Sequence, residues 1–181
     1  MRVTVKTGIL FAALWITIKM VMYLGGIVDS QIPGTLINIL CLLLAISVGL
    51  YLKKKEGNTG NALNDIKDGI SAGLPYTLII SLFLYFFYGS VDKDFIDHKI
   101  NERITAVDKY LENPNNWNQI KSENSSYETY TIEQFKEEEA EKTRTFNSPK
   151  ALMIMSMLGG LMLGVFYSIF VTIIYRKLLF R

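Results

Sequence analysis

The sequence predicts an all-α membrane protein, a four-transmembrane-helix bundle with an extracytoplasmic helical hairpin between spans 3 and 4. Four apolar blocks support this prediction, at about residues 7–28, 32–52, 69–91 and 151–175. Lys19 is the only charged residue inside these blocks. Each block is close to the roughly 20 residues that a helix needs to cross the hydrocarbon core of a bilayer.

The composition excludes several other classes of protein. The chain has 181 residues, of which 50% are hydrophobic, and its single cysteine, Cys41, rules out a disulfide framework. A net charge of +2 is too small for the basic surface of a nucleic-acid-binding protein. We expect no metal, because His98 has no cysteine or second histidine at the spacing of metal ligands. We also expect no cofactor, because the sequence has no glycine-rich phosphate loop and no nucleophile elbow.

The first block has features of a signal peptide, because basic residues precede a short apolar run. The apolar run resumes after Lys19 and continues to Val28, and no small-residue cleavage site follows it. We therefore expect an uncleaved first span.

The charges between the spans differ in sign on the two sides of the membrane. One side carries three acidic residues and nine basic ones, which are Arg2, Lys6, Lys53, Lys54, Lys55, Lys67, Arg176, Lys177 and Arg181. The other side carries Asp29 and the segment 92–149, in which eight Lys and Arg face thirteen Asp and Glu. The positive-inside rule places the first side, with both chain termini, in the cytoplasm.

The chain accordingly divides into residues 1–91 with spans 1 to 3, the extracytoplasmic segment 92–148, and residues 149–181 with span 4 and the cytoplasmic C-terminus. In the middle segment, helical spacing relates a set of apolar residues: Phe95, Ile96, Ile100, Ile104, Val107 and Leu111. This helix is expected to continue span 3 outward and to end at Asn113-Pro114. An irregular stretch containing Trp117, Tyr127 and Tyr130 follows it.

A second helix is expected from the capping box Thr131–Gln134 to about Thr145, and Pro149 should begin span 4. The apolar stripe of the first helix needs a covering surface. The second helix and the irregular stretch are one such surface, and a partner protein or the lipid surface is the other.

Small residues recur every four positions in spans 3 and 4. The two stripes are Gly69, Gly73, Thr77 and Ser81, and Ser156, Gly160, Gly164, Ser168 and Thr172. Apolar side chains gain nothing by leaving lipid for protein, so transmembrane helices associate where small residues let their backbones approach. We expect spans 3 and 4 to pack together through these stripes, and homodimerisation through one stripe is the alternative.

Lys19 is the first candidate for a functional residue, because a lysine at the centre of a span costs about 2.5–3.5 kcal/mol on insertion scales. Trp15 and Tyr23 lie one turn away on the same helix face. Helix rise places three further polar residues at a similar depth, so we expect one intramembrane cluster of Lys19, Trp15, Tyr23, Asn38, Tyr85 and Ser156. In one interpretation Lys19 snorkels or bonds to a neighbouring helix. In the other it binds a lipid phosphate or a carboxylate of another subunit.

Several motifs along the chain resemble one family, catalogued as domain of unknown function 4199. They are the lysine-rich end of span 2, the polar link 57–68, the glycine-containing segment 69–73, the Val-Asp-Lys-Asp-Phe sequence at 91–95, Ser148-Pro149 and the glycine-rich segment 159–164. The likeness covers almost the whole chain. It implies a four-span protein of the Gram-negative inner membrane with an external helical insertion, and association with a membrane-associated glycosyltransferase. It supplies no catalytic residue.

The leading functional hypothesis is a non-enzymatic accessory or scaffold subunit that contacts another membrane protein or a second copy of itself. The alternative is a binder or carrier of an anionic lipid or lipid-linked sugar that uses Lys19. A small transporter is the third hypothesis, and the low span count argues against it. Membrane lipids are expected to surround the chain, and no nucleic-acid partner is expected.

The charge asymmetry predicts the result of a labelling experiment. In intact spheroplasts, a membrane-impermeant thiol reagent should modify Asn124→Cys, which lies outside the cytoplasm, and should leave Asn58→Cys unmodified. Labelling at position 58 and not at position 124 would show that the topology is inverted.

Overall fold

The computed structural model describes residues 2–26, 31–57 and 61–179. Helices make up most of these ranges, and no strand occurs in them. Four helical stretches are long and apolar enough to cross a membrane: Val3–Leu24, Gly34–Lys55, Ala62–Val91 and Pro149–Leu178. The prediction of an all-α membrane protein is confirmed, as is the prediction of four spans.

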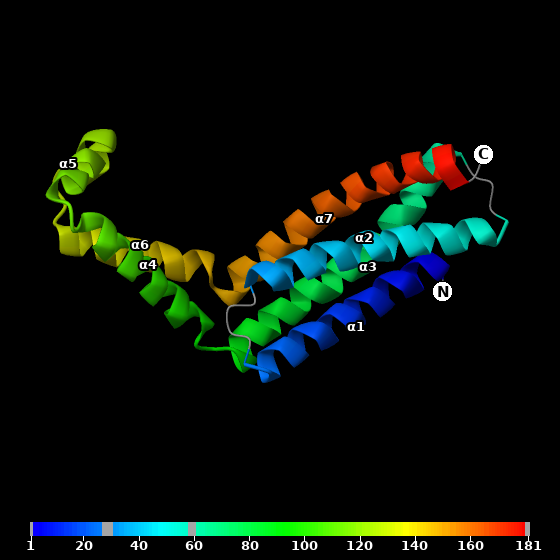
Figure 1. Cartoon of the computed structure of the whole chain (residues 1–181), viewed down its shortest axis with the longest axis horizontal. Coiled ribbons are helices and arrows are strands. Elements are labelled where there is room, and N and C mark those ends of the chain that lie inside the picture. Colours follow the sequence, from blue (N-terminus) through cyan, green and yellow to red (C-terminus); the bar gives the residue numbers. More distant parts are fainter. Residues whose placement is uncertain (1, 27–30, 58–60, 180–181) are drawn as a thin grey trace. The chain divides into compact units, whose positions relative to one another are not determined.

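The chain forms two compact units, which we describe separately. The bundle unit comprises Met1–Phe83 and Met153–Arg181, and the insertion unit comprises Leu84–Leu152. Four long helices build the bundle, and Figure 1 shows them side by side: α1 (Val3–Leu24), α2 (Gln31–Lys55), α3 (Ala62–Phe86) and α7 (Pro149–Ile174). A π-helical turn, Tyr175–Leu179, follows α7.

The third span begins earlier than its apolar block. Its helix starts at Ala62, whereas the apolar block starts at residue 69. Asn61 supports this start, because its side-chain oxygen accepts a hydrogen bond of 2.9 Å from the backbone N–H of Asn64. The charged residues of the predicted link therefore lie on the first two turns of α3.

Small residues bring α1, α2 and α3 together. A Cβ added to Gly8 of α1 would lie 2.2 Å from the backbone oxygen of Ala72 in α3. A Cβ added to Gly49 of α2 would lie 2.6 Å from Oγ1 of Thr7. These helices therefore approach to a distance that no larger residue would permit, and close van der Waals contact is what stabilises such helices in lipid.

The two small-residue stripes lie against each other between α3 and α7. A Cβ at Gly69 would meet Oγ of Ser168 at 2.7 Å, and one at Gly160 would meet Cγ2 of Thr77 at 2.6 Å. A Cβ at Gly73 would lie 3.5 Å from Cα of Gly164. Ser81 and Ser156 complete the pairing, with their hydroxyl oxygens 2.9 Å apart.

Helix α3 does not continue without a break into the first long helix of the insertion unit. After α3 the chain forms a π-helical turn, Phe87–Val91, and then leaves the helical conformation at Asp92, where φ is −110° and ψ is 67°. Helix α4 starts at Phe95 and ends at Leu111. The expectation of one continuous helix is wrong, because the turn lets the buried rings of Tyr88 and Phe95 pack 4.2 Å apart.

The stretch after α4 is also more regular than expected. Helix α5 (Pro114–Glu123) begins where Asn113 caps it, with the Asn113 side chain accepting a hydrogen bond of 3.1 Å from Asn115 N–H. Proline fits the first helical position because its missing N–H has no partner there. A short 3₁₀ turn, Ser125–Tyr127, leads to α6 (Ile132–Phe146). The capping box of Thr131 and Gln134 is confirmed, with hydrogen bonds of 3.2 and 2.9 Å.

Helices α4 and α6 pack together and cover part of the apolar stripe of α4. Val107 of α4 and Phe135 of α6 are buried. The Phe135 ring lies 5.4 Å from the ring of Trp117 and 5.1 Å from that of Tyr127. The α6 helix and the α5 region thus provide the small core of the insertion unit.

The packing of α3 against α7 predicts the effect of adding single methyl groups. Gly69→Ala and Gly160→Ala should each destabilise the protein by about 1–3 kcal/mol, the usual cost of overpacking, measured by thermal unfolding in detergent. Gly159→Ala is the matched control beside Gly160, because no atom lies within 4 Å of its added Cβ. Its helix-propensity gain of about 1 kcal/mol should leave stability unchanged or higher. Equal effects at positions 159 and 160 would contradict the packing.

Candidate functional site

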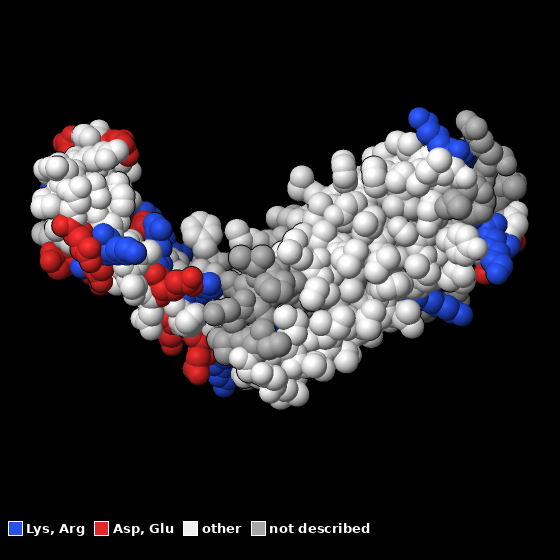
Figure 2. Space-filling model, in the orientation of Figure 1, with Lys and Arg blue, Asp and Glu red and all other residues white. Residues whose placement is uncertain are grey.

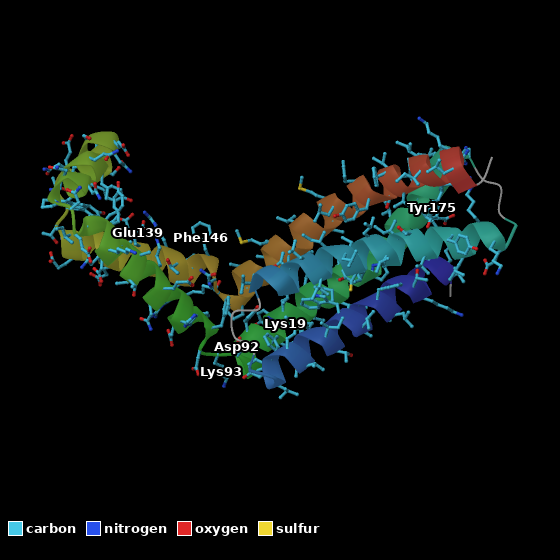
Figure 3. All side chains as sticks on the ribbon, in the orientation of Figure 1. Lys19, Asp92, Lys93, Glu139, Phe146 and Tyr175 are labelled. Carbon is cyan, nitrogen blue, oxygen red and sulfur yellow. The ribbon has the colours of Figure 1, made fainter. Side chains whose placement is uncertain are left out.

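The predicted intramembrane cluster includes Lys19, which lies inside the bundle rather than along its outer surface. Its relative exposure is 8%, and Figure 3 labels it on α1. Trp15, one turn earlier, is also buried, and its indole N–H donates a hydrogen bond of 3.2 Å to the backbone oxygen of Gly34. Tyr23 is exposed. The Lys19 side chain is therefore buried among the helices of the bundle.

The remaining members of the predicted cluster make other contacts. Asn38 of α2 faces Tyr76 of α3, whose hydroxyl lies 2.5 Å from Oδ1 and 3.0 Å from the backbone oxygen of Asn38. Ser156 pairs with Ser81, as described above. Tyr85 belongs to the insertion unit, where its ring contacts Phe86 at 5.4 Å. The prediction that these residues form one cluster around Lys19 stays a prediction.

These contacts form a series of polar links between neighbouring helices. Trp15 links α1 to α2, the Asn38–Tyr76 pair links α2 to α3, and the Ser81–Ser156 pair links α3 to α7. Hydrogen bonds between transmembrane helices contribute about 0.6 kcal/mol on average. Their main consequence is geometric, because each one fixes the register of two helices.

A buried carboxylate lies at the end of the bundle that carries the termini. Asp65, in the first turn of α3, has a relative exposure of 5%. Its Oδ1 lies 2.9 Å from Nζ of Lys54 in α2, and its Oδ2 lies 2.7 Å from Nε of Arg176 in the turn after α7. One carboxylate thus joins three helices, and its two cationic partners compensate the cost of burying its charge.

Sequence reasoning missed this ion-pair cluster. Asp65 counted only as one acid in a polar link, because the apolar block of span 3 starts later. The local sequence around residue 61 could have revealed this ion-pair cluster. Asn61 is a favourable N-cap residue, and a helix that starts there carries Asp65 into the bundle beside the lysines that end α2.

The insertion unit contains an open groove of about 410 Å³ between α4, α5 and α6. Its lining residues are Arg103, Ala106, Val107, Tyr110, Ile120 and Phe135. Val107 and Phe135 form a buried apolar base, whereas Tyr110 is 48% exposed. Arg103 also donates a hydrogen bond of 2.9 Å from Nε to Glu139, and this bond helps to join α4 to α6.

Ionised side chains also order the region near the groove. Nζ of Lys142 lies 2.6 Å from Oε1 of Glu138 and 2.8 Å from the hydroxyl of Tyr127. The hydrogen bond from Lys142 lowers the pKa of the Glu138 carboxyl, and the same bond raises the pKa of Lys142. The charge of Glu138 raises the pKa of the Tyr130 hydroxyl. The Glu138–Lys142 pair is therefore ionised throughout the neutral pH range.

The chain has one cysteine and one histidine, which could in principle take part in chemistry. Cys41 is a free, buried thiol within α2. His98 is exposed on α4. Within the described ranges, no group of three or more His, Cys, Asp and Glu side chains is arranged to hold a metal ion.

The comparison with protein families agrees with the motifs noted in the sequence. A family model described as protein of unknown function (DUF4199) matches residues 6–177, nearly the whole chain. The chain belongs to this family. No curated protein and no solved structure matches the chain. The DUF4199 chain is thus a multi-pass membrane protein by its four spans, and its function has to be argued from its own residues.

The ion-pair cluster around Asp65 predicts a large effect of one charge removal. Asp65→Asn leaves Lys54 and Arg176 without their shared carboxylate, and breaking a buried pair in this way costs about 3–5 kcal/mol. We expect a loss near the lower end of that range, because the Arg176 side chain is 36% exposed. Thermal unfolding in detergent at pH 7 measures it. Glu56→Gln, an exposed acid just after α2, is the control, and equal midpoints for both variants would contradict the role of Asp65.

Proposed function

We propose that this DUF4199 protein is a non-enzymatic accessory or scaffold subunit of a membrane complex and that it binds its partner through the groove of the insertion unit. The observation that carries this proposal is the composition of that groove. Tyr110 and Arg103 belong to the residue types enriched at binding hot spots, and they border an apolar base formed by Val107 and Phe135. A polar rim around an apolar centre is the usual anatomy of a protein interface.

The negative charge of the insertion indicates what kind of protein segment would bind there. The segment 92–149 carries thirteen Asp and Glu against eight Lys and Arg. A docking segment with apolar side chains flanked by Lys or Arg would complement both the groove and this acidic surface. A membrane-associated glycosyltransferase of the bacterial inner membrane is the first partner class to test, following the family resemblance.

The bundle offers less support for association through its small residues. The stripes of α3 and α7 are in contact within one chain, so a homodimer through either stripe would have to separate them. The opposite side of α7 faces outward, with Met162 at 76% exposure and open space around the Cβ position of Gly159. That surface suits lipid.

A second candidate function is recognition of an anionic lipid or lipid-linked sugar by Lys19. One observation favours it. Lys19 is buried in the bundle, and a lysine at the centre of a span costs about 2.5–3.5 kcal/mol on insertion, a cost that methionine or leucine would avoid. The two proposals predict different co-purified molecules: a membrane protein for the first and an anionic lipid for the second.

The test is affinity purification from membranes in a mild detergent, with bound proteins and lipids identified by mass spectrometry. Ala106→Arg places a long charged side chain in the groove and should reduce the co-purified membrane protein at least tenfold. Thr105→Arg makes the same charge change at the neighbouring exposed position, which does not line the groove, and should retain the partner. Both positions are exposed, so both variants should unfold at the temperature of the unmodified protein.

Two results would contradict the accessory role. One is equal recovery of the partner with both arginine variants. The other is recovery of a specific anionic lipid with no membrane protein, which would favour the Lys19 proposal.

A further inference from the structure

A second, polar groove lies at the end of the bundle that carries the termini. Its volume is about 270 Å³, and it is lined by Arg2, Lys53, Asn64, Lys67 and Asp68. Pockets for drug-sized ligands begin at roughly 300 Å³, so this groove suits a smaller group. Three cationic side chains and one acidic side chain line it, and the site therefore has a net positive charge.

The three cations are available to a ligand. Among the ion pairs formed by residues 2–26, 31–57 and 61–179, none involves Arg2, Lys53 or Lys67. The nearby buried acid, Asp65, is already paired with Lys54 and Arg176. Asp68 offsets only part of the charge of these three cations, and like charges that converge repel one another, so a bound anion would lower the energy of this end of the bundle.

The groove lies where the spans end. Arg2 immediately precedes α1, Lys53 is in the last turn of α2, and Asn64, Lys67 and Asp68 are in the first two turns of α3. Figure 2 shows Lys and Arg side chains at this end of the bundle and an uncharged surface along its length. In a bilayer this position corresponds to the head-group layer that flanks the hydrocarbon core.

We propose that the groove binds the phosphate group of an acidic phospholipid. The Arg2 guanidinium has the fork geometry that binds two phosphate oxygens, and Lys53 and Lys67 add positive charge. The Asn64 amide is a further hydrogen-bond donor. Basic pockets between transmembrane helices are a recurrent form of lipid head-group site. This proposal is independent of the groove in the insertion unit and of Lys19.

The test uses the purified full-length protein in a neutral detergent. Phosphatidylglycerol, phosphatidylcholine and inorganic phosphate are titrated separately, and native mass spectrometry counts the bound molecules. We expect phosphatidylglycerol to bind and the other two to bind at least tenfold more weakly. A lysine near an anionic head group contributes about fivefold in affinity, so Lys53→Gln with Lys67→Gln should weaken phosphatidylglycerol binding about thirtyfold.

The control is Lys6→Gln with Lys55→Gln, which makes the same charge change at exposed positions of the same end that do not line the groove. Its effect should stay below about threefold. Asp68→Asn removes the acidic side chain from the groove and should tighten phosphatidylglycerol binding, a gain that loss of folding cannot imitate.

Three outcomes would overturn the proposal. Equal weakening by the two double variants would assign the binding to diffuse surface charge. Equal binding of phosphatidylcholine would remove the role of the anion. Displacement of phosphatidylglycerol by inorganic phosphate at millimolar concentration would assign the groove to a soluble anion.

Discussion

The close approach of helices through small residues is the constraint on which the rest of this structure depends. Lipid tails are as apolar as leucine, so burial alone does not hold α1, α2, α3 and α7 together. Gly8 lets α1 meet the backbone of α3 at Ala72, and Gly69 and Gly160 let α3 meet α7. These contacts determine which helices are neighbours, and the polar groups are placed accordingly.

Polar contacts then fix register in a bundle whose apolar surfaces would tolerate sliding. The hydrogen bonds of Trp15 with Gly34, Tyr76 with Asn38, and Ser81 with Ser156 each join a different pair of helices. At the end of the bundle, Asp65 joins three helices with one carboxylate. Asp65 is thus paired with Lys54 and Arg176, and the groove lined by Arg2, Lys53 and Lys67 at the same end of the bundle does not include it.

The insertion unit is stabilised differently from the bundle, because its helices carry many charged residues around a small apolar core. Phe135 and Val107 supply a small core, and charged side chains on α4 and α6 pair across the helix interface, as Arg103 does with Glu139. A core of this size leaves a groove open beside Tyr110. The unit therefore combines modest internal packing with an open groove that has an apolar base.

The sequence by itself determined the features that depend on local patterns. Apolar runs of bilayer length specify the four spans, because a helix satisfies its backbone polar groups within its own segment, as lipid requires. The spacing of Gly69 to Ser81 and of Ser156 to Ser168 predicted the stripes that the structure brings into contact. The capping box at Thr131 likewise specifies where α6 begins, since a cap needs only neighbouring residues.

Only the tertiary structure decided the contacts between residues that are distant along the chain. Asn38 and Ser156 were expected at one depth, and the structure pairs them with Tyr76 and Ser81, contacts that depend on how each helix is rotated about its own axis. The break at Asp92 depends on a turn that packs Tyr88 against Phe95. The sequence showed Asp65 only as one acidic residue of the polar link 57–68, and its pairing with Lys54 and Arg176 depends on the packing of distant parts of the chain. Periodicity along one helix carries no information about the rotation of its neighbours, and that rotation is set by packing.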